Sequence, residues 1–138
     1  MSLPHIDHIG IIVEDLDECI ALFEAILGLK ACDVKQLDEV GLKIATLRTE
    51  NVDIELIQYL TPGSFGEKIM GKSPGINHIS VRTENTASMI KKFEQNGVPV
   101  LEGFPRKGNH GEVAFFDKRA VGSILLEVCS YLEPGKKT

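Results

Sequence analysis

The chain has 138 residues, a formal net charge of −5 and 43% hydrophobic residues, which fits a single globular domain. Its acidic balance, with no cluster of Lys and Arg beyond Lys136-Lys137, argues against a nucleic-acid partner. The charge balance therefore favours small-molecule chemistry. No apolar run approaches the roughly 18–20 residues of a membrane span, and the N-terminus lacks a basic region before an apolar core. Cys19, Cys32 and Cys129 lack disulfide-like spacing, so we expect reduced thiols and a cytoplasmic location.

The first half of the chain predicts a strand, a helix and three further strands. Residues 6–13 alternate in polarity and are rich in β-branched side chains, which indicates a strand. Asp15 and Glu18 have capping-box spacing, so we expect a helix that begins after Asp15 and ends at Gly28. Its apolar stripe consists of Cys19, Ile20, Phe23, Ile26 and Leu27. The three further strands are predicted at residues 31–36, 41–48 and 52–60.

The second half predicts the same order of elements. A connection from residue 62 to 75 contains one short helical turn near 67–70. The strands and helix that follow are predicted at 76–83 (strand), 86–96 (helix, ended by Gly97), 98–102, 111–117 and 122–131 (strands). We therefore predict an α+β fold with two tandem βαβββ modules, at about 4–62 and 74–132, within one domain of residues 1–138. Neither module should be stable alone.

An internal repeat relates the two halves. His8, Glu14 and Phe23 recur 70 positions later as His78, Glu84 and Phe93. Each half then ends in an apolar strand with one acid, Glu55 in the first and Glu127 in the second. A carboxylate in such a strand is costly to bury unless something compensates its charge.

A divalent metal ion bound by His8, Glu55, His78 and Glu127 would compensate both acids, because the internal symmetry can bring the four side chains together. Co²⁺, Mn²⁺, Ni²⁺ and Zn²⁺ accept mixed imidazole and carboxylate ligands. Four protein ligands on an octahedral ion leave two positions open. The pattern therefore predicts a site for a chelating substrate.

Several segments resemble the vicinal oxygen chelate (glyoxalase/bleomycin resistance/dioxygenase) superfamily, and within it most of all the methylmalonyl-CoA epimerase family. They are HIGIIVEDLDECIALFEAILGL, EVGLKIATLRTENVDIELIQYL, GINHISVRTEN and KGNHGEVAFFDKRAVGSILLEVC. The resemblance implies a glyoxalase-like fold, in which the paired modules form a cupped mixed sheet around one metal ion. It also implies the ligands His8, Glu55, His78 and Glu127, and a homodimer.

The resemblance implies an epimerase that inverts the α-carbon of methylmalonyl-CoA through a metal-stabilised enolate. Glu39, in the turn before a strand, and Glu127, which is also a ligand, would be the two proton-transfer acids. Arg82 shares strand parity with His78 and is a candidate substrate contact. Asn109 and His110, in a Gly-rich loop that resembles a family loop over the site, are further candidates.

Other members of the superfamily leave alternatives open. Glyoxalase I (lactoylglutathione lyase), which acts on a glutathione hemithioacetal, resembles this chain in fold and in the same four ligand types. A non-catalytic antibiotic-binding protein would not need the metal ligands, and a ring-cleaving dioxygenase would not need Glu55. We expect a thioester or thiol-adduct substrate. The native metal, and the pairing of modules within one chain or between two chains, stay open.

Overall fold

The computed structural model describes residues 3–131, which divide into two compact units. The N-terminal unit comprises residues 8–77, and the C-terminal unit comprises residues 3–7 together with 78–131. Lys136-Lys137 lies outside the described residues. Between residues 3 and 131, no helix is long and apolar enough to cross a membrane.

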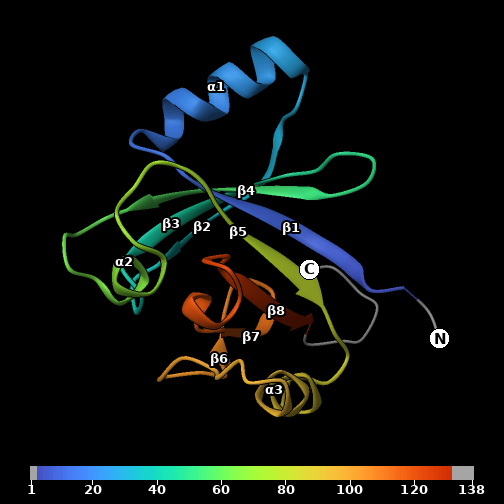
Figure 1. Ribbon diagram of the computed structural model, residues 1–138. Coiled ribbons are helices and arrows are strands. Elements are labelled where there is room, and N and C mark those ends of the chain that lie inside the picture. Colours follow the sequence, from blue (N-terminus) through green and yellow to red (C-terminus); the bar gives the residue numbers. More distant parts are fainter. Residues whose placement is uncertain (1–2, 132–138) are drawn as a thin grey trace. The chain divides into compact units, whose positions relative to one another are not determined.

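The N-terminal unit is a four-stranded sheet with one long helix (Figure 1). Its elements are β1 (His5–Ile12, in this unit from residue 8), α1 (Leu16–Leu27), β2 (Ala31–Leu37), β3 (Leu42–Leu47), β4 (Asp53–Tyr59) and α2 (Phe65–Met70). The strand order is β2-β3-β4-β1, in which β1 runs parallel to β4 and the other pairs are antiparallel. Asp15 caps α1 by accepting from the Glu18 backbone N–H at 3.0 Å, and Gly28 ends it at φ 70°, as the sequence predicts.

The C-terminal unit repeats this topology. Its elements are β5 (Gly75–Arg82, in this unit from residue 78), α3 (Thr86–Gln95), β6 (Arg106–Lys107), β7 (Gly111–Phe115), the short 3₁₀ helix η1 (Lys118–Ala120) and β8 (Leu126–Tyr131). The strand order is β5-β8-β7-β6, in which β5 runs parallel to β8 and the other pairs are antiparallel. The predicted α+β class and the repeated βαβββ order are therefore confirmed.

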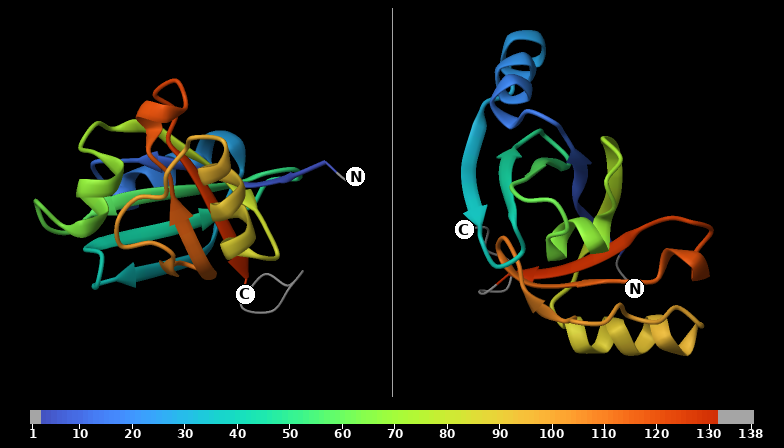
Figure 2. Two further views of the ribbon diagram at one scale, coloured as in Figure 1. Left: turned by 60° about the horizontal axis from the view of Figure 1, so that its bottom comes forward. Right: turned by 90° about the vertical axis from the view of Figure 1, so that its left-hand side faces the viewer.

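In each unit one helix covers one face of the sheet. The face of β3 and β4 under α1 buries Ala45, Leu47 and Leu56 against Leu16. α3 lies beside β7 and β8 (Figure 2). The face of these strands beside α3 buries Ala114 and Val128, and Phe93 of α3 stacks on Phe116 with ring centroids 3.9 Å apart. Because side chains alternate along a strand, the residues between these core positions point to the opposite face.

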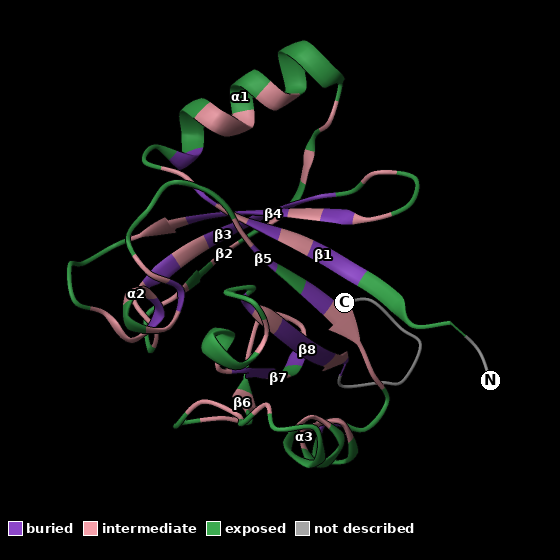
Figure 3. Cartoon of the chain, in the orientation of Figure 1, coloured by how far each residue is buried: buried purple, intermediate pink, exposed green. Residues whose placement is uncertain are grey.

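The predicted apolar stripe of α1 is only partly buried. Cys19, Ile20 and Phe23 pack against the core of the N-terminal unit, whereas Ile26 and Leu27 are 74% and 61% exposed. Figure 3 shows the end of α1 farthest from β4 as exposed. The apolar stripe and the end of the helix at Gly28 are as the sequence predicts, but the last two apolar residues of the stripe do not join the core.

Two predicted strands of the second half also differ from the structure. Residues 98–102 form a single bridge, Val100 with Phe116, rather than a strand. Pro99 has no N–H for a ladder, and the short strand lies instead at β6. The strand expected from residue 122 begins at Leu126, because Gly122 and Ser123 have positive φ and the Ser123 N–H bonds back to the Lys118 carbonyl at 2.9 Å.

Candidate metal centre

Strand alternation places each predicted ligand on the sheet face opposite its unit's helix. In the parallel pair of β1 and β4, Gly10 is the register partner of Glu55, and His8 shares the face of Gly10. In the parallel pair of β5 and β8, Ser80 is the partner of Glu127, and His78 shares the face of Ser80. Each unit thus carries one histidine and one glutamate side by side.

We call His8 and Glu55 the first half-site. His8 and Glu55 are each 4% exposed, and His8 Nε2 lies 3.4 Å from Glu55 Oε1. This separation exceeds that of a good hydrogen bond between nitrogen and oxygen, about 2.7–3.2 Å. Two atoms that each lie about 2.0–2.2 Å from one ion are separated by roughly 3–3.5 Å at octahedral or tetrahedral angles. The first half-site therefore has the spacing of two ligands of one metal ion.

We call His78 and Glu127 the second half-site. They are 3% and 6% exposed, and His78 Nε2 lies 3.8 Å from Glu127 Oε1. The rings of His78 and Phe115 pack in a T-shaped arrangement, with centroids 5.1 Å apart and an interplanar angle of 82°, which restricts the orientation of the imidazole. A small closing movement would bring both atoms to one ion.

The donor set fits a divalent metal. Buried carboxylates are stable when a cation compensates them, and a neutral imidazole offers a nitrogen lone pair in the same place. Imidazole with carboxylate is a ligand combination that suits Zn²⁺, Co²⁺, Ni²⁺ and Mn²⁺. Each half-site offers one imidazole and one carboxylate.

The structure places Glu39 in the turn between β2 and β3, where it is exposed. This turn is closed by backbone bonds from Gly41 N–H to the carbonyls of Leu37 and Asp38. Glu39 belongs to neither His–Glu pair. Its side chain is therefore free of the burial that constrains Glu55 and Glu127.

Arg82, at the end of β5, packs on an aromatic ring. It shares the face of His78 and Ser80, and its guanidinium carbon lies 4.3 Å from the centre of the Tyr131 ring. The Tyr131 hydroxyl donates to Asp7 Oδ1 at 2.6 Å, and both residues are buried. Burial, followed by this hydrogen bond to Asp7, raises the pKa of Tyr131 well above its ordinary value. Tyr131 therefore stays a neutral donor at physiological pH.

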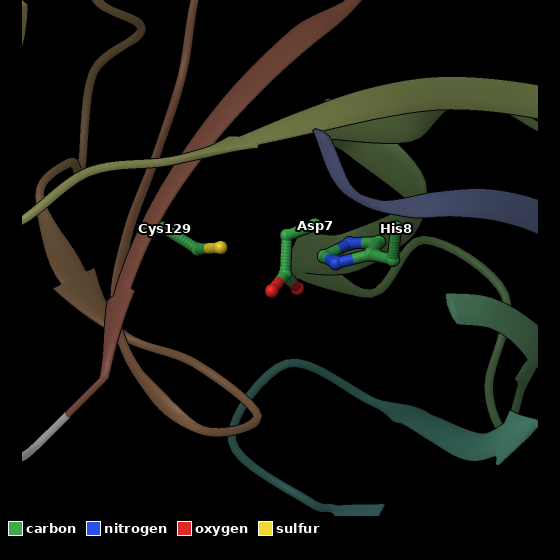
Figure 4. Close-up of side chains that lie close together, drawn as sticks. All are labelled: Asp7, His8 and Cys129. Atoms are coloured by element: carbon green, nitrogen blue, oxygen red, sulfur yellow. The ribbon is translucent and has the colours of Figure 1, made fainter. Parts of the chain in front are cut away.

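Cys129 lies on the same side of β8 as Tyr131 and Glu127. Its sulfur points toward Asp7 (Figure 4), and the thiol and a ligand atom of that carboxylate lie within 4.8 Å of each other. Figure 4 also labels His8, which follows Asp7 in β1. The buried carboxylate of Asp7 thus has both a phenol and a thiol beside it.

Asn109 and His110 lie in the hairpin between β6 and β7 and are half-buried. Asn109 Nδ2 and His110 Nε2 are 3.3 Å apart, and the His110 ring stacks beside Tyr131 with centroids separated by 5.4 Å. The structure therefore brings Arg82 and His110, two of the three predicted substrate contacts, to one aromatic ring. Sequence reasoning missed Tyr131 and Asp7. For Tyr131 alone the sequence held a signal, since it has the same strand parity as Glu127; nothing in the sequence marked its bond to Asp7.

Comparison with known proteins defines the class. The sequence model of the Glyoxalase/Bleomycin resistance protein/Dioxygenase superfamily matches residues 7–116, and the chain belongs to this superfamily. The ethylmalonyl-CoA/methylmalonyl-CoA epimerase of Cereibacter sphaeroides is 28% identical over 130 residues, which cover 91% of this chain and 97% of that protein.

Solved structures agree. A hypothetical protein from Bacillus halodurans C-125 matches with a TM-score of 0.86 and 29% identity. The match covers 99% of this chain and 100% of the chain of that protein. A methylmalonyl-CoA epimerase in complex with methylmalonyl-CoA and NH4+ matches with a TM-score of 0.83 and 26% identity, over 95% of this chain and 96% of its own. The glyoxalase-like fold predicted from the sequence is therefore confirmed, and the chain is similar to methylmalonyl-CoA epimerases.

Proposed function

We propose that the protein is a metal-dependent epimerase that inverts the α-carbon of methylmalonyl-CoA. The observation that carries the proposal is the pair of buried His–Glu half-sites at repeat-equivalent positions, with Nε2–Oε1 distances of 3.4 and 3.8 Å. The similarity to methylmalonyl-CoA epimerases supports the choice of substrate. We propose that His8, Glu55, His78 and Glu127 together hold one Co²⁺, Mn²⁺, Ni²⁺ or Zn²⁺ ion.

An α-proton beside a thioester is too weakly acidic for a carboxylate to remove unaided. The metal, when bound, would supply the Lewis acid that stabilises the negative charge of the enolate oxygen. Glu39 and Glu127 are the proton-transfer groups of the proposal: one carboxylate takes the α-proton from one side of the planar enolate, and the other returns a proton to the opposite side. Their roles exchange when the reaction runs backward.

The remaining residues of the proposal bind and orient the substrate. Arg82, Asn109 and His110 are proposed substrate contacts, and the grouping of Arg82 and His110 at Tyr131 supports a shared task. The proposal extends to a cytoplasmic homodimer in which the half-sites combine within one chain or between two. In either arrangement the four ligands are the same.

A glyoxalase-type lyase is the second candidate, because the chain belongs to the same superfamily and carries the same four ligand types. Two glutamates with two histidines are the four ligand types by which glyoxalase I resembles this chain. The substrate would then be the hemithioacetal of methylglyoxal and glutathione. The proton would be moved from one carbon to the adjacent carbon, and no stereocentre would be inverted in place.

One experiment distinguishes these functions. Protein loaded with Co²⁺ is incubated in D₂O with methylmalonyl-CoA and, separately, with the glutathione hemithioacetal, and deuterium incorporation and products are followed by NMR. The proposal expects exchange of the α-proton of methylmalonyl-CoA and no lactoylglutathione. Formation of lactoylglutathione alone would establish the lyase instead. Absence of both reactions would favour a binding protein without catalysis.

A further inference from the structure

The guanidinium of Arg82 has a donor that no side chain of the described residues satisfies. Arg82 Nη2 is buried, and it has no hydrogen-bond partner among residues 3–131. A buried donor that carries charge is expensive to leave unpaired. The face of the Tyr131 ring stabilises the charge of the stacked guanidinium, but it accepts no hydrogen bond from the N–H groups at the edge of the guanidinium. A ligand with an acceptor group at this edge would remove the cost.

A second unpaired donor lies on the same face of β5. The Ser80 side chain is 0% exposed, and its hydroxyl has no hydrogen-bond partner within the described part of the chain. Ser80 stands between Arg82 and the predicted ligand His78, whose Cα atoms are about 13 Å apart on an extended strand. The Arg82 guanidinium lies over Tyr131, which is two positions beyond Cys129, the register partner of Arg82 in β8. One face of β5 therefore offers a metal ligand and two unsatisfied donors in succession.

We infer that Arg82 recognises a carboxylate of the substrate, with Ser80 beside it, and that Tyr131, held by Asp7, positions the Arg82 guanidinium. A planar guanidinium matches a carboxylate with two parallel hydrogen bonds. The Tyr131 ring is held by the 2.6 Å bond from its hydroxyl to Asp7 and by stacking on His110. A guanidinium stacked on such a ring keeps one orientation.

The internal repeat shows that these donors are not required by the fold. The positions of β1 that correspond to Ser80 and Arg82 are Gly10 and Ile12, which carry no side-chain donor. Tyr59, which corresponds to Tyr131, donates instead to the Gly71 carbonyl at 2.6 Å. Within residues 3–131, the cation stacked on a phenol is Arg82 on Tyr131, in the second copy. The inference deepens the proposed function, and it relies on that function for the place where the substrate binds.

The test compares two thioesters that differ only in the carboxylate. Isobutyryl-CoA carries a methyl group where methylmalonyl-CoA carries its carboxylate, and the CoA phosphates are identical. Binding to the Co²⁺-loaded protein is measured by calorimetry for the wild type, Arg82→Met, Arg82→Lys and Tyr131→Phe. Metal content and thermal melts of each variant serve as controls.

We expect Arg82→Met to weaken binding of methylmalonyl-CoA by about 10- to 100-fold, as for loss of a hydrogen bond between charged groups, and to leave isobutyryl-CoA unchanged. Arg82→Lys should restore part of the loss. Tyr131→Phe keeps the ring and loses the bond to Asp7, so it should weaken only the carboxylate ligand, by several-fold. Equal weakening of both thioesters by Arg82→Met would mean that Arg82 binds the CoA phosphates, and it would overturn the inference. Unchanged binding by Tyr131→Phe would overturn the positioning role.

A second measurement does not depend on CoA or on metal. The Arg82 Nε–H resonance of EDTA-treated protein is followed during titration with malonate, and with neutral malonamide as the control. A shift with malonate alone is expected, and an unmoved or equally moved resonance would reject carboxylate recognition. Carboxylate-dependent binding without α-proton exchange would reject the epimerase proposal while this inference stands.

Discussion

Gly10 and Ser80 occupy the same place in the two units, each directly across a parallel strand pair from the glutamate of its own half-site. This equivalence means that the half-sites share one construction and should contribute alike to metal binding.

We predict that His8→Ala and His78→Ala each reduce the affinity for Co²⁺ by more than the ~10- to 100-fold typical of losing an outer partner of a ligand. His5→Ala, at the exposed start of β1, is the matched control and should bind as the wild type does. Elemental analysis of the wild type should give one ion per chain. Two ions per chain, each lost with only one histidine, would show that the half-sites act separately.

Metal removal should abolish exchange of the α-proton and leave the fold largely intact. Each half-site lies on strands whose opposite faces already build a core, at Leu56 in one unit and Val128 in the other. Metal bound only by the folded protein adds about 2.7 kcal/mol of stability at a concentration of 100 Kd. Thermal melts with EDTA, and then with excess Mn²⁺ or Co²⁺, check this. A melting temperature that no divalent ion changes would contradict it.

Glu39→Gln should retain the metal and lose epimerisation by at least ~10²-fold, the effect of a positioned general base. Its amide has nearly the shape of the carboxylate and cannot accept the proton. Glu50→Gln, another exposed acid near a strand connection of the same unit, should keep full activity. Rates of deuterium incorporation and metal content are measured for both variants. An active Glu39→Gln protein would reject the assigned role, as would a metal-free one.

Both tyrosines of the chain should ionise at a higher pH than an exposed tyrosine does. Burial, and then the charge of Glu67, raise the pKa of Tyr59 to about 12, and the pKa of Tyr131 is raised too. A raised pKa means that the folded state prefers the neutral phenol. The resulting stability is complete below the unfolded pKa of about 10 and is lost as the pH rises toward 12.

The near-ultraviolet absorbance of tyrosinate measures this directly. Native protein should show little tyrosinate near pH 10, whereas denaturant should return both groups to about 10. Tyr59→Phe and Tyr131→Phe assign the two steps. Half-ionised tyrosines near pH 10 in the native protein would contradict the burial of both hydroxyls.

The sequence singled out the two His–Glu pairs that lie close together in the structure, because their pattern is local and repeated, whereas their role as metal ligands stays a prediction. A histidine that alternates with apolar residues, and one acid inside an apolar strand, each have few structural explanations, and their recurrence after 70 positions removed most of the others. The N-cap of α1 at Asp15 and its C-terminal end at Gly28 were also predictable from the sequence. These features depend on neighbours in sequence, which a pattern reveals.

Features that depend on distant residues were missed. The bond between Tyr131 and Asp7 joins residues 124 positions apart, and no local pattern marks it. The apolar residues Ile124 and Leu125 suggested an early start of β8, but hydrogen bonds from Ser123 and Ile124 to η1 and its cap hold them in a turn. Ile26 fitted the periodicity of α1, yet it is exposed and does not pack against the core of its unit.

The duplicated architecture separates two tasks that a single-copy enzyme would have to solve together. Both copies retain the histidine and the glutamate, whereas only the second copy places a serine and an arginine further along its first strand. With the roles proposed above, substitutions at Ser80 and Arg82 should change substrate preference while the four proposed ligand side chains stay as they are.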